Sequence, residues 1–383
     1  MLVLIKNRWS PIIAFTMVLV LLLGLPAQAA FESAAEAAVL QDYFTGNVLY
    51  EKNAAQAKPP ASITKLMTLL LAFEALEDGD VTWETPLTVS EAAWRMGGSQ
   101  MFLEIGQEVT FRDLITGISV VSANDACVVV AEHLAGSEGA FVGVMNERAG
   151  QLGLQHTTFK NATGLPAEGH VMSPMDIVVL SRHLLTNYPG VLEFESQREF
   201  TYNGIRQYNR NPLIGRYEGA DGLKTGWTEE AGFCLAATAQ REGLRLIGVI
   251  LNTPSEKERL TAAEELLDYG FANFRLYEIP EGEVIGDVPV DKGRKLSVPV
   301  KTASRMALAI ERRRMAELEQ EVIAVGDVRA PIKVGDPLGR LQIKQAGQVL
   351  AETELVAAED VARANILLRF FRWLLSLIKI RPA

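Results

Sequence analysis

Apolar residues recur with a helical period in several stretches of the first 277 residues. Leu66, Leu69, Leu70 and Phe73 stand at i, i+3, i+4 and i+7, which predicts a helix with one buried face. Further helical segments are predicted at 111–118, 126–134, 175–185 and 262–269. The break at 119–125 is therefore expected to be a connection between two helical pieces.

Strand patterns lie before and after these helices. Val39-Leu40 and Val48-Leu49-Tyr50 flank a turn-forming tetrad, which predicts a hairpin over 38–51. The runs 233–239 and 244–251 are strand-like, and a tight turn is expected between them. The residues just before this pair are therefore expected to begin an antiparallel edge.

The composition changes near residue 277. Apolar and polar residues alternate at 296–300 and 341–343, between turns rich in Gly, Pro and Asp. This pattern predicts a small antiparallel β domain that reaches Asp360. Residues 306–320 have helical propensity but strand neighbours, so their structure stays open at this stage.

The first 29 residues have the pattern of an export signal. Lys6 and Arg8 precede an apolar run at 12–25, and small residues follow it. This order predicts a secretory signal that is cut after Ala29. The apolar run is shorter than the ~20 residues that a membrane span needs, although an uncleaved anchor is the alternative.

The last 23 residues, 361–383, are predicted to form an amphipathic helix. Their polar positions are spaced four, three, four and three: Asn365, Arg369, Arg372, Ser376 and Lys379. On a helix these residues form one stripe, and the remaining surface is apolar. A helix that lies in a membrane interface fits both features better than a span with charges inside it. Docking of the apolar face on the protein's own β domain is the alternative.

The charge balance argues against a nucleic-acid partner. The formal net charge is −10, and it becomes −12 without Lys6 and Arg8. The tail carries five basic residues and no acidic one, so the body from Ala30 to Asp360 has a charge of −17. Nucleic-acid affinity comes from lysine and arginine that neutralise phosphates. The sequence has no Walker loop, dinucleotide fingerprint or zinc-ligand cluster, so we expect neither a cofactor nor a metal.

The two cysteines, Cys127 and Cys234, both stand in apolar sequence. They allow at most one disulfide, so this is not a disulfide scaffold. Buried thiols are the expected state, with a bridge or a reactive cysteine as the alternatives.

Ser62 and Lys65 are the first candidate catalytic residues. Pro59 and Pro60 suit a helix entrance, which puts Ser62 near the first turn with Lys65 about one turn away. A hydroxyl needs a neighbouring base to become a good nucleophile. Lysine can be that base where a dry, positively charged site favours its neutral form. The motif alone is weak, because a second Ser-x-x-Lys occurs at 376–379.

Two further motifs stand in the positions where the predicted elements meet. Ser122-Ala123-Asn124 is the only Ser-x-Asn in the chain, and Lys224-Thr225-Gly226 precedes the predicted strand pair. A hydroxyl can relay a proton, and an amide can hold a peptide carbonyl. Gly226 leaves room for a substrate backbone beside the strand. Each motif alone also fits an ordinary helix connection or strand entrance.

Together the three motifs resemble a known enzyme family. They occur in this order, about 60 and about 100 residues apart, as in class A β-lactamases and penicillin-binding proteins. The chain resembles the low-molecular-mass penicillin-binding proteins, which are serine-type D-alanyl-D-alanine carboxypeptidases. The likeness extends to the flanking residues at 45–52, 60–68, 122–126 and 221–228.

The resemblance implies roles for the reacting groups. Ser62 would attack the carbonyl of a D-Ala-D-Ala bond and form an acyl-enzyme, with Lys65 as general base. Ser122 would help to pass the proton to the leaving amine. The backbone N–H groups of Ser62 and Trp227 would form the oxyanion hole.

The resemblance also implies how the substrate is held. Asn124 would position the peptide, Thr225 would bind the substrate carboxylate, and Gly226 belongs to the same motif. Lys224 would supply positive charge that also keeps Lys65 reactive. Arg259 resembles the family's carboxylate-binding arginine. Relatives often have histidine where this chain has Trp227, which puts substrate preference and deacylation rate in doubt.

The implied fold is α+β. A β-lactamase/transpeptidase-like domain (30–277), with helices on an antiparallel sheet, would follow the signal peptide (1–29). A β-sandwich domain (278–360) and the amphipathic tail (361–383) would complete the chain. The implied partners are peptidoglycan stem peptides, β-lactam inhibitors and, through the tail, the periplasmic side of the inner membrane. Such a protein acts in cell-wall synthesis and cell shape.

Three other functions stay open at this point. A β-lactamase would share the motifs but needs a deacylation carboxylate before Lys-Thr-Gly, and the loop at 161–165 lacks an obvious one. A D,D-endopeptidase would cut cross-links with the same residues. A weakly active penicillin-binding structural protein is the third alternative.

Overall fold

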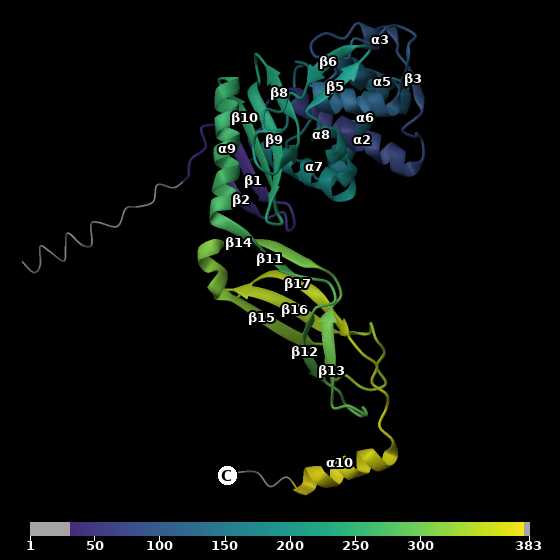
Figure 1. Cartoon of the computed structure of the whole chain (residues 1–383), viewed down its shortest axis with the longest axis vertical. Coiled ribbons are helices and arrows are strands. Elements are labelled where there is room, and N and C mark those ends of the chain that lie inside the picture. The colour runs from purple at the N-terminus through teal and green to yellow at the C-terminus, as the bar shows by residue number, and fades with distance from the viewer. Residues whose placement is uncertain (1–30, 379–383) are drawn as a thin grey trace, which may run out of the picture. The chain divides into compact units, whose positions relative to one another are not determined.

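The computed structural model describes residues 31–378, with side chains as far as Trp373 (Figure 1). The predicted signal peptide therefore lies outside the described residues. The described chain forms a region of mixed helices and strands, followed by a region of antiparallel strands, as the apolar periodicities predict.

An antiparallel sheet forms the centre of the first region. Its strand order is β2-β1-β10-β9-β7, and β8 also pairs with β9. The bounds are β1 Ala37–Asp42, β2 Val48–Lys52, β7 Ala220–Gly222, β8 Thr225–Thr228, β9 Gly232–Arg241 and β10 Leu244–Thr253. Both predicted strand pairs, the hairpin β1–β2 and the pair β9–β10, are confirmed. The strands β1, β9 and β10 are buried almost throughout, so their apolar runs pack on both faces.

Helices cover both faces of this sheet. The helix α9 lies along one face, and the other helices gather on the opposite side (Figure 1). The longer helices are α2 Lys65–Asp78, α5 Asn124–Ala135, α6 Glu138–Gln151, α7 Pro174–Asn187 and α9 Glu256–Asn273. Shorter helical pieces are η1 Ala61–Thr64, α3 Glu91–Trp94, α4 Phe111–Thr116, η2 Gly117–Val121, η3 Pro189–Val191 and α8 Leu192–Glu195. Two small hairpins complete the region: β3 Pro86–Thr88 with β4 Glu108–Thr110, and β5 Glu199–Tyr202 with β6 Ile205–Tyr208.

Two predicted helix boundaries are wrong. The break expected at 119–125 is shorter, because η2 continues as a π-helix to Val121 and α5 begins at Asn124. The last helix of this region begins at Glu256 rather than Ala262, so Arg259 lies inside it. Ser255 caps this helix by accepting a hydrogen bond from the Glu258 amide, a local signal that the apolar pattern alone does not contain.

The second region is built from two antiparallel sheets. One has the order β12-β13-β17-β16-β15, and the other consists of β11 and β14. The bounds are β11 Phe274–Ile279, β12 Val284–Pro289, β13 Ser297–Thr302, β14 Met306–Glu311, β15 Leu318–Ala324, β16 Pro337–Gln345 and β17 Gln348–Ala357. The expected junction at 277/278 falls inside β11. Residues 306–320, left open above, form strand, a short 3-10 helix (η4, Arg312–Glu317) and strand, so their neighbours override their propensity.

The β domain extends a few residues beyond the predicted end at Asp360. Val361 is buried among the apolar residues of this domain and is bridged to Ile332. Arg363 is likewise bridged to Gly293. The tail helix α10 follows at Ile366–Ile378.

Within the described part of the chain, no single helix has the length and apolar character to cross a membrane, although α5 and α6 meet these criteria together across an 81° bend. Cys127 and Cys234 are both buried and free, as predicted.

Candidate active site

Ser62 and Lys65 lie in contact at the start of the helix that was predicted to carry them. The α-helix begins only at Lys65, and Ser62 stands in the 3-10 turn η1 that leads into it. The Lys65 ammonium nitrogen is 2.9 Å from the Ser62 hydroxyl oxygen. The predicted pair of nucleophile and base is therefore within hydrogen-bond distance.

Lys65 is fully buried, and its hydrogen-bond partners are uncharged oxygens. Its nitrogen also bonds the side-chain oxygen of Asn124 at 2.7 Å and the backbone oxygen of Thr163 at 2.6 Å. Burial lowers the pKa of Lys65 to about 7; Cys127 and Asp125 oppose this shift, and the positive charge of Lys224 adds to it. A neutral amine can accept the hydroxyl proton of Ser62, so this environment makes lysine a usable base near neutral pH.

Asn124 holds Lys65 from the side of α5. Its side-chain nitrogen donates to the Gly97 carbonyl at 2.7 Å, and its backbone nitrogen donates to the Ser99 carbonyl at 2.7 Å. Both ends of its amide are thus engaged inside the protein, and the residue is 3 % exposed. The structure assigns Asn124 to the orientation of Lys65; its contact with a substrate peptide stays a prediction.

Ser122 faces the same cleft from a strained backbone. Its φ of +63° lies in the left-handed region, which residues other than glycine rarely adopt. Its hydroxyl has no hydrogen-bond partner, and the residue lines the cleft together with Ser62. A free hydroxyl in this position suits the predicted transfer of a proton to the leaving group.

The loop at 161–166 supports the turn that carries Ser62. Gly164 has a φ of +85°, and a Cβ there would lie 1.8 Å from the carbonyl oxygen of Ala61. Thr68 donates to the Ala162 carbonyl at 2.8 Å, and Thr163 supplies the carbonyl that holds Lys65. The loop thus presents a backbone oxygen to Lys65 and no carboxylate of its own.

The strand β8 forms the opposite wall of the cleft. Thr225 and Gly226 are buried at the start of this edge strand, and the Trp227 side chain is 59 % exposed at the rim. A Cβ at Gly226 would lie 2.6 Å from the Pro60 carbonyl oxygen, so glycine lets the strand approach η1. Lys224 is 1 % exposed just before the strand.

The cleft between these walls has a volume of about 460 Å³. Its lining consists of Ser62, Ser99, Ser122, Arg210, Thr225, Gly226, Trp227, Phe233, Glu256 and Arg259. Arg259 is 6 % exposed, and its Nε has no hydrogen-bond partner. The sequence did not single out Arg210, because an exposed arginine just after the β5–β6 hairpin belongs to no motif. Two arginines beside a buried lysine make this cleft suitable for a carboxylate.

Comparison with known proteins assigns the family. The family model for D-alanyl-D-alanine carboxypeptidase matches residues 25–255, and the model for the C-terminal domain of penicillin-binding protein 5 matches residues 271–363. The chain belongs to the D-alanyl-D-alanine carboxypeptidase family. This confirms the resemblance inferred from the three motifs and the expected α+β fold with a C-terminal β domain.

Individual relatives agree over most of the chain. D-alanyl-D-alanine carboxypeptidase DacF of Bacillus subtilis is 38% identical over 340 residues, which are 87% of each protein. The structure of penicillin binding protein 5 from Haemophilus influenzae has a TM-score of 0.76 at 32% identity, and covers 88% of this chain and 99% of its own. Penicillin-Binding Protein D2 from Listeria monocytogenes, in its ampicillin-bound form, has a TM-score of 0.59 at 34% identity, and covers 64% and 100%.

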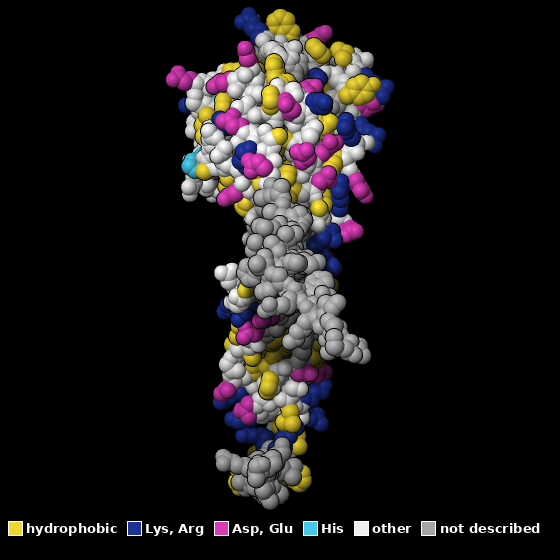
Figure 2. All heavy atoms as spheres, turned by 90° about the vertical axis from the view of Figure 1, so that its left-hand side faces the viewer, with side chains coloured by type: hydrophobic (Ala, Val, Ile, Leu, Met, Phe, Trp, Pro, Cys, Tyr) yellow, Lys and Arg dark blue, Asp and Glu magenta, His cyan; other side chains and the backbone are white. Residues whose placement is uncertain are grey.

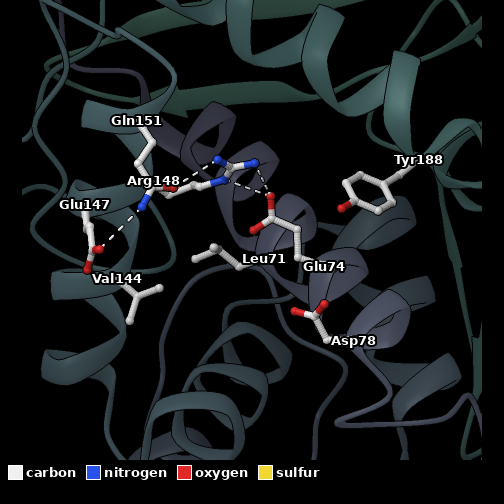
Figure 3. Close-up of a pocket in the computed structure, with 8 residues that line it drawn as sticks. All are labelled: Leu71, Glu74, Asp78, Val144, Glu147, Arg148, Gln151 and Tyr188. Atoms are coloured by element: carbon white, nitrogen blue, oxygen red, sulfur yellow. Dashed lines mark hydrogen bonds and ion pairs between the residues drawn. The ribbon is translucent and has the colours of Figure 1, made fainter.

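A second hollow on this member of the carboxypeptidase family is lined mainly by residues of α2 and α6 (Figure 3). Arg148 of α6 reaches Glu74 of α2 there at 2.6 Å and also bonds Gln151 at 3.0 Å. The charged groups at its centre are thus paired with one another, and the hollow contains none of the residues around Ser62. We interpret the charged residues of this hollow as structural, because the ion pair of Arg148 and Glu74 joins α6 to α2.

The pKa of Lys65 predicts a pH dependence. Below about pH 7 Lys65 holds a proton and cannot accept one from Ser62, so acylation by a β-lactam should rise as the pH increases through about 7. Stopped-flow acylation rates between pH 5.5 and 8 measure this. A rate that is constant or falls across that range would contradict Lys65 as the base.

Removal of the Lys224 charge should slow acylation without unfolding the protein. Loss of one electrostatic donor in such a site typically costs about 10²–10³ in rate. We expect this loss in Lys224→Ala. Lys257→Ala is the matched control, because Lys257 is exposed on α9 and lies outside the cleft lining. Equal acylation rates in the two variants would show that Lys224 has no role in acylation and that Lys-Thr-Gly only begins the strand.

Proposed function

We infer that the protein is a serine-type D-Ala-D-Ala carboxypeptidase. The observation that carries this inference is the hydroxyl of Ser62 at 2.9 Å from a buried lysine whose pKa is lowered to about 7. The family assignment supports it over both structured regions. The substrate would be a peptide that ends in D-Ala-D-Ala, with its terminal carboxylate near Lys224, Thr225 and Arg259.

The geometry supports a two-step reaction through an acyl-enzyme. Neutral Lys65 takes the Ser62 proton while the hydroxyl oxygen bonds to the carbonyl carbon of the penultimate D-alanine. The carbonyl oxygen becomes an oxyanion, for which the N–H groups of Ser62 and Trp227 are the predicted donors. Ser122 passes the proton from Lys65 to the leaving nitrogen, the C–N bond breaks, and D-alanine departs. Water then hydrolyses the ester and regenerates Ser62.

We propose peptidoglycan stem pentapeptides as the substrate and β-lactams as inhibitors that acylate Ser62. A β-lactam offers a strained amide beside a carboxylate, the same two features that the cleft is suited to bind. A β-lactamase is less well supported, because the loop at 161–166 offers Lys65 a carbonyl and no carboxylate. Endopeptidase action on cross-links would use the same reacting groups and differ only in the length of peptide beyond the cut bond.

The reaction is tested by release of free D-alanine from a pentapeptide that ends in D-Ala-D-Ala. We expect Ser62→Ala to abolish the release of D-alanine. The same substitution should abolish the β-lactam adduct that mass spectrometry detects in the wild type. The matched control is Ser376→Ala, which alters the other Ser-x-x-Lys sequence and should retain both activities. An adduct that survives in Ser62→Ala, or that maps to Ser122, would overturn the assignment.

We propose, in addition, that the mature protein works at the outer face of the inner membrane, held there by α10. Ile366, Leu367 and Phe370 are 79 %, 77 % and 59 % exposed, so the apolar face of this helix is uncovered. One residue of the polar stripe contacts the β domain instead: Arg372 donates to the carbonyls of Gly293 and Arg294 at 2.7 and 2.8 Å. This placement disfavours docking of the apolar face on the β domain.

Basic side chains lie close to this helix and suit anionic headgroups. Arg294, Lys295 and Arg363 are exposed at the end of the β domain from which α10 emerges, and Figure 2 shows basic groups gathered at that end. Arg372 departs from the prediction that the whole polar stripe meets headgroups, since its guanidinium bonds protein carbonyls. The charge and the apolar face together fit an interfacial helix.

Removal of α10 should release an active, soluble enzyme. The chain should end after Ala364, because Val361 belongs to the core of the β domain. We expect the full-length protein, but not the shortened one, to sediment with vesicles of phosphatidylglycerol and phosphatidylethanolamine. The double variant Val322→Ser, Ile323→Ser is a control that removes exposed apolar residues elsewhere in the domain. Sedimentation of the shortened protein would show that the anchor lies elsewhere.

A further inference from the structure

A buried glutamate lies behind the active-site cleft, outside the three motifs. Glu195 ends the short helix α8 and is 0 % exposed. The strand β7 passes over this helix so closely that a Cβ at Gly222 would lie 3.6 Å from the Glu195 Cβ. Two residues after Gly222 the chain reaches Lys224, which is also buried. A carboxylate and an ammonium are thus enclosed in the same part of the core.

The carboxyl group of Glu195 is unusual because neither of its oxygens has a hydrogen-bond partner. The hydroxyl of Ser119, on η2, lies close enough to lower the pKa of Glu195, although the two groups do not have the geometry of a normal hydrogen bond. Burial of an unpaired carboxylate is costly, and natural proteins rarely retain one without a reason. Burial raises the pKa of Glu195, and the charge of Lys224 opposes that rise.

The proposed reaction gives the two lysines of the site opposite requirements. Lys65 must be neutral to accept a proton, whereas Lys224 must be charged to attract a carboxylate. Both are fully buried, and the charge of each disfavours the charge of the other. Something must give Lys224 the higher proton affinity. Lys65 is held by the neutral oxygens of Asn124 and Thr163, whereas the negative charge of Glu195 raises the pKa of Lys224 against the effect of burial.

We propose that Glu195 is a positioning residue that keeps Lys224 charged while Lys65 is neutral. This inference rests on the proposed acylation of Ser62. Once the pH is high enough to ionise Glu195, its negative charge stabilises the ammonium of Lys224 in the same enclosure. The cleft therefore keeps its cation at a pH at which the base is already free.

The other charged groups around Lys224 cannot take this role. Arg210 and Arg259 are positive and lower its pKa. Burial raises the pKa of the Cys127 thiol to about 12, so this group is neutral in the working range. Glu195 is thus the group that can stabilise the Lys224 charge there.

The test compares pH profiles of acylation by a β-lactam in three proteins. Glu195→Gln removes the charge and keeps the size of the side chain. Glu193→Gln is the matched control, because Glu193 lies on the same short helix and is exposed. We expect the alkaline limb of Glu195→Gln to move down by about one pH unit, the shift typical of a lost opposite charge. The acid limb set by Lys65 should stay in place, and Glu193→Gln should match the wild type.

Further measurements separate this role from a structural one. Glu195→Asp keeps the charge and should restore the alkaline limb at least in part. In the wild type the raised pKa of Glu195 means that the folded state holds a proton which the unfolded chain releases above about pH 4.5. That contribution to stability is lost as the pH rises through the folded pKa, so the melting temperature of Glu195→Gln relative to wild type should increase with pH.

Each outcome decides a different point. A wild-type protein that is not acylated at any pH would overturn the proposed function itself. Acylated wild type with a Glu195→Gln profile of unchanged shape, whether at the same or a lower rate, would overturn only the role of Glu195. If Glu195→Gln does not fold, a Glu195→Asp profile identical to that of wild type supports the proposal, and loss of its alkaline limb with a stable fold contradicts it.

Discussion

The chemistry of this protein depends on one buried amine. Lys65 has no contact with water and is bonded by three oxygens, none of which belongs to a carboxylate. A carboxylate in any of these places would stabilise the ammonium and keep the base protonated. Neutral dipoles fix its position and leave its proton affinity low. Much of the surrounding fold can be understood as the support that this arrangement requires.

That support comes from segments far apart in the chain. Asn124 enters from a helix that follows a π-helical turn, and Thr163 enters from a loop whose glycine permits contact with η1. Asp125, next to Asn124, accepts hydrogen bonds from the amides of Met101 and Leu103 at 3.0 and 3.3 Å. The loop that holds Asn124 is therefore itself fixed to α5. A displaced oxygen around Lys65 would alter both its position and its pKa.

The reacting groups could be predicted from the sequence better than the groups that set their positions and pKa values. Ser62, Lys65, Ser122 and Lys224 belong to motifs with fixed spacing, and the structure brings them to one cleft or directly behind it. Thr163 acts through its backbone oxygen, and a backbone contact cannot be predicted from the residue type. Glu195 stands in an unremarkable polar stretch, and only its burial distinguishes it. The helix start at Glu256 was missed because a capping serine, and not the apolar period, determines it. The structure of residues 306–311 had to be left open, because sheet neighbours outweigh helical propensity there.

The contact between Gly226 and the turn before Ser62 determines how wide the cleft is at its floor. A side chain at position 226 would meet the carbonyl of Pro60 at 2.6 Å, so the two walls are separated by little more than the hydrogen atom that glycine carries. Because of this contact, β8 and the turn before Ser62 cannot move closer together. The floor of the cleft is therefore rigid, and a substrate has to fit the space that already exists, because strand and turn cannot close around it there.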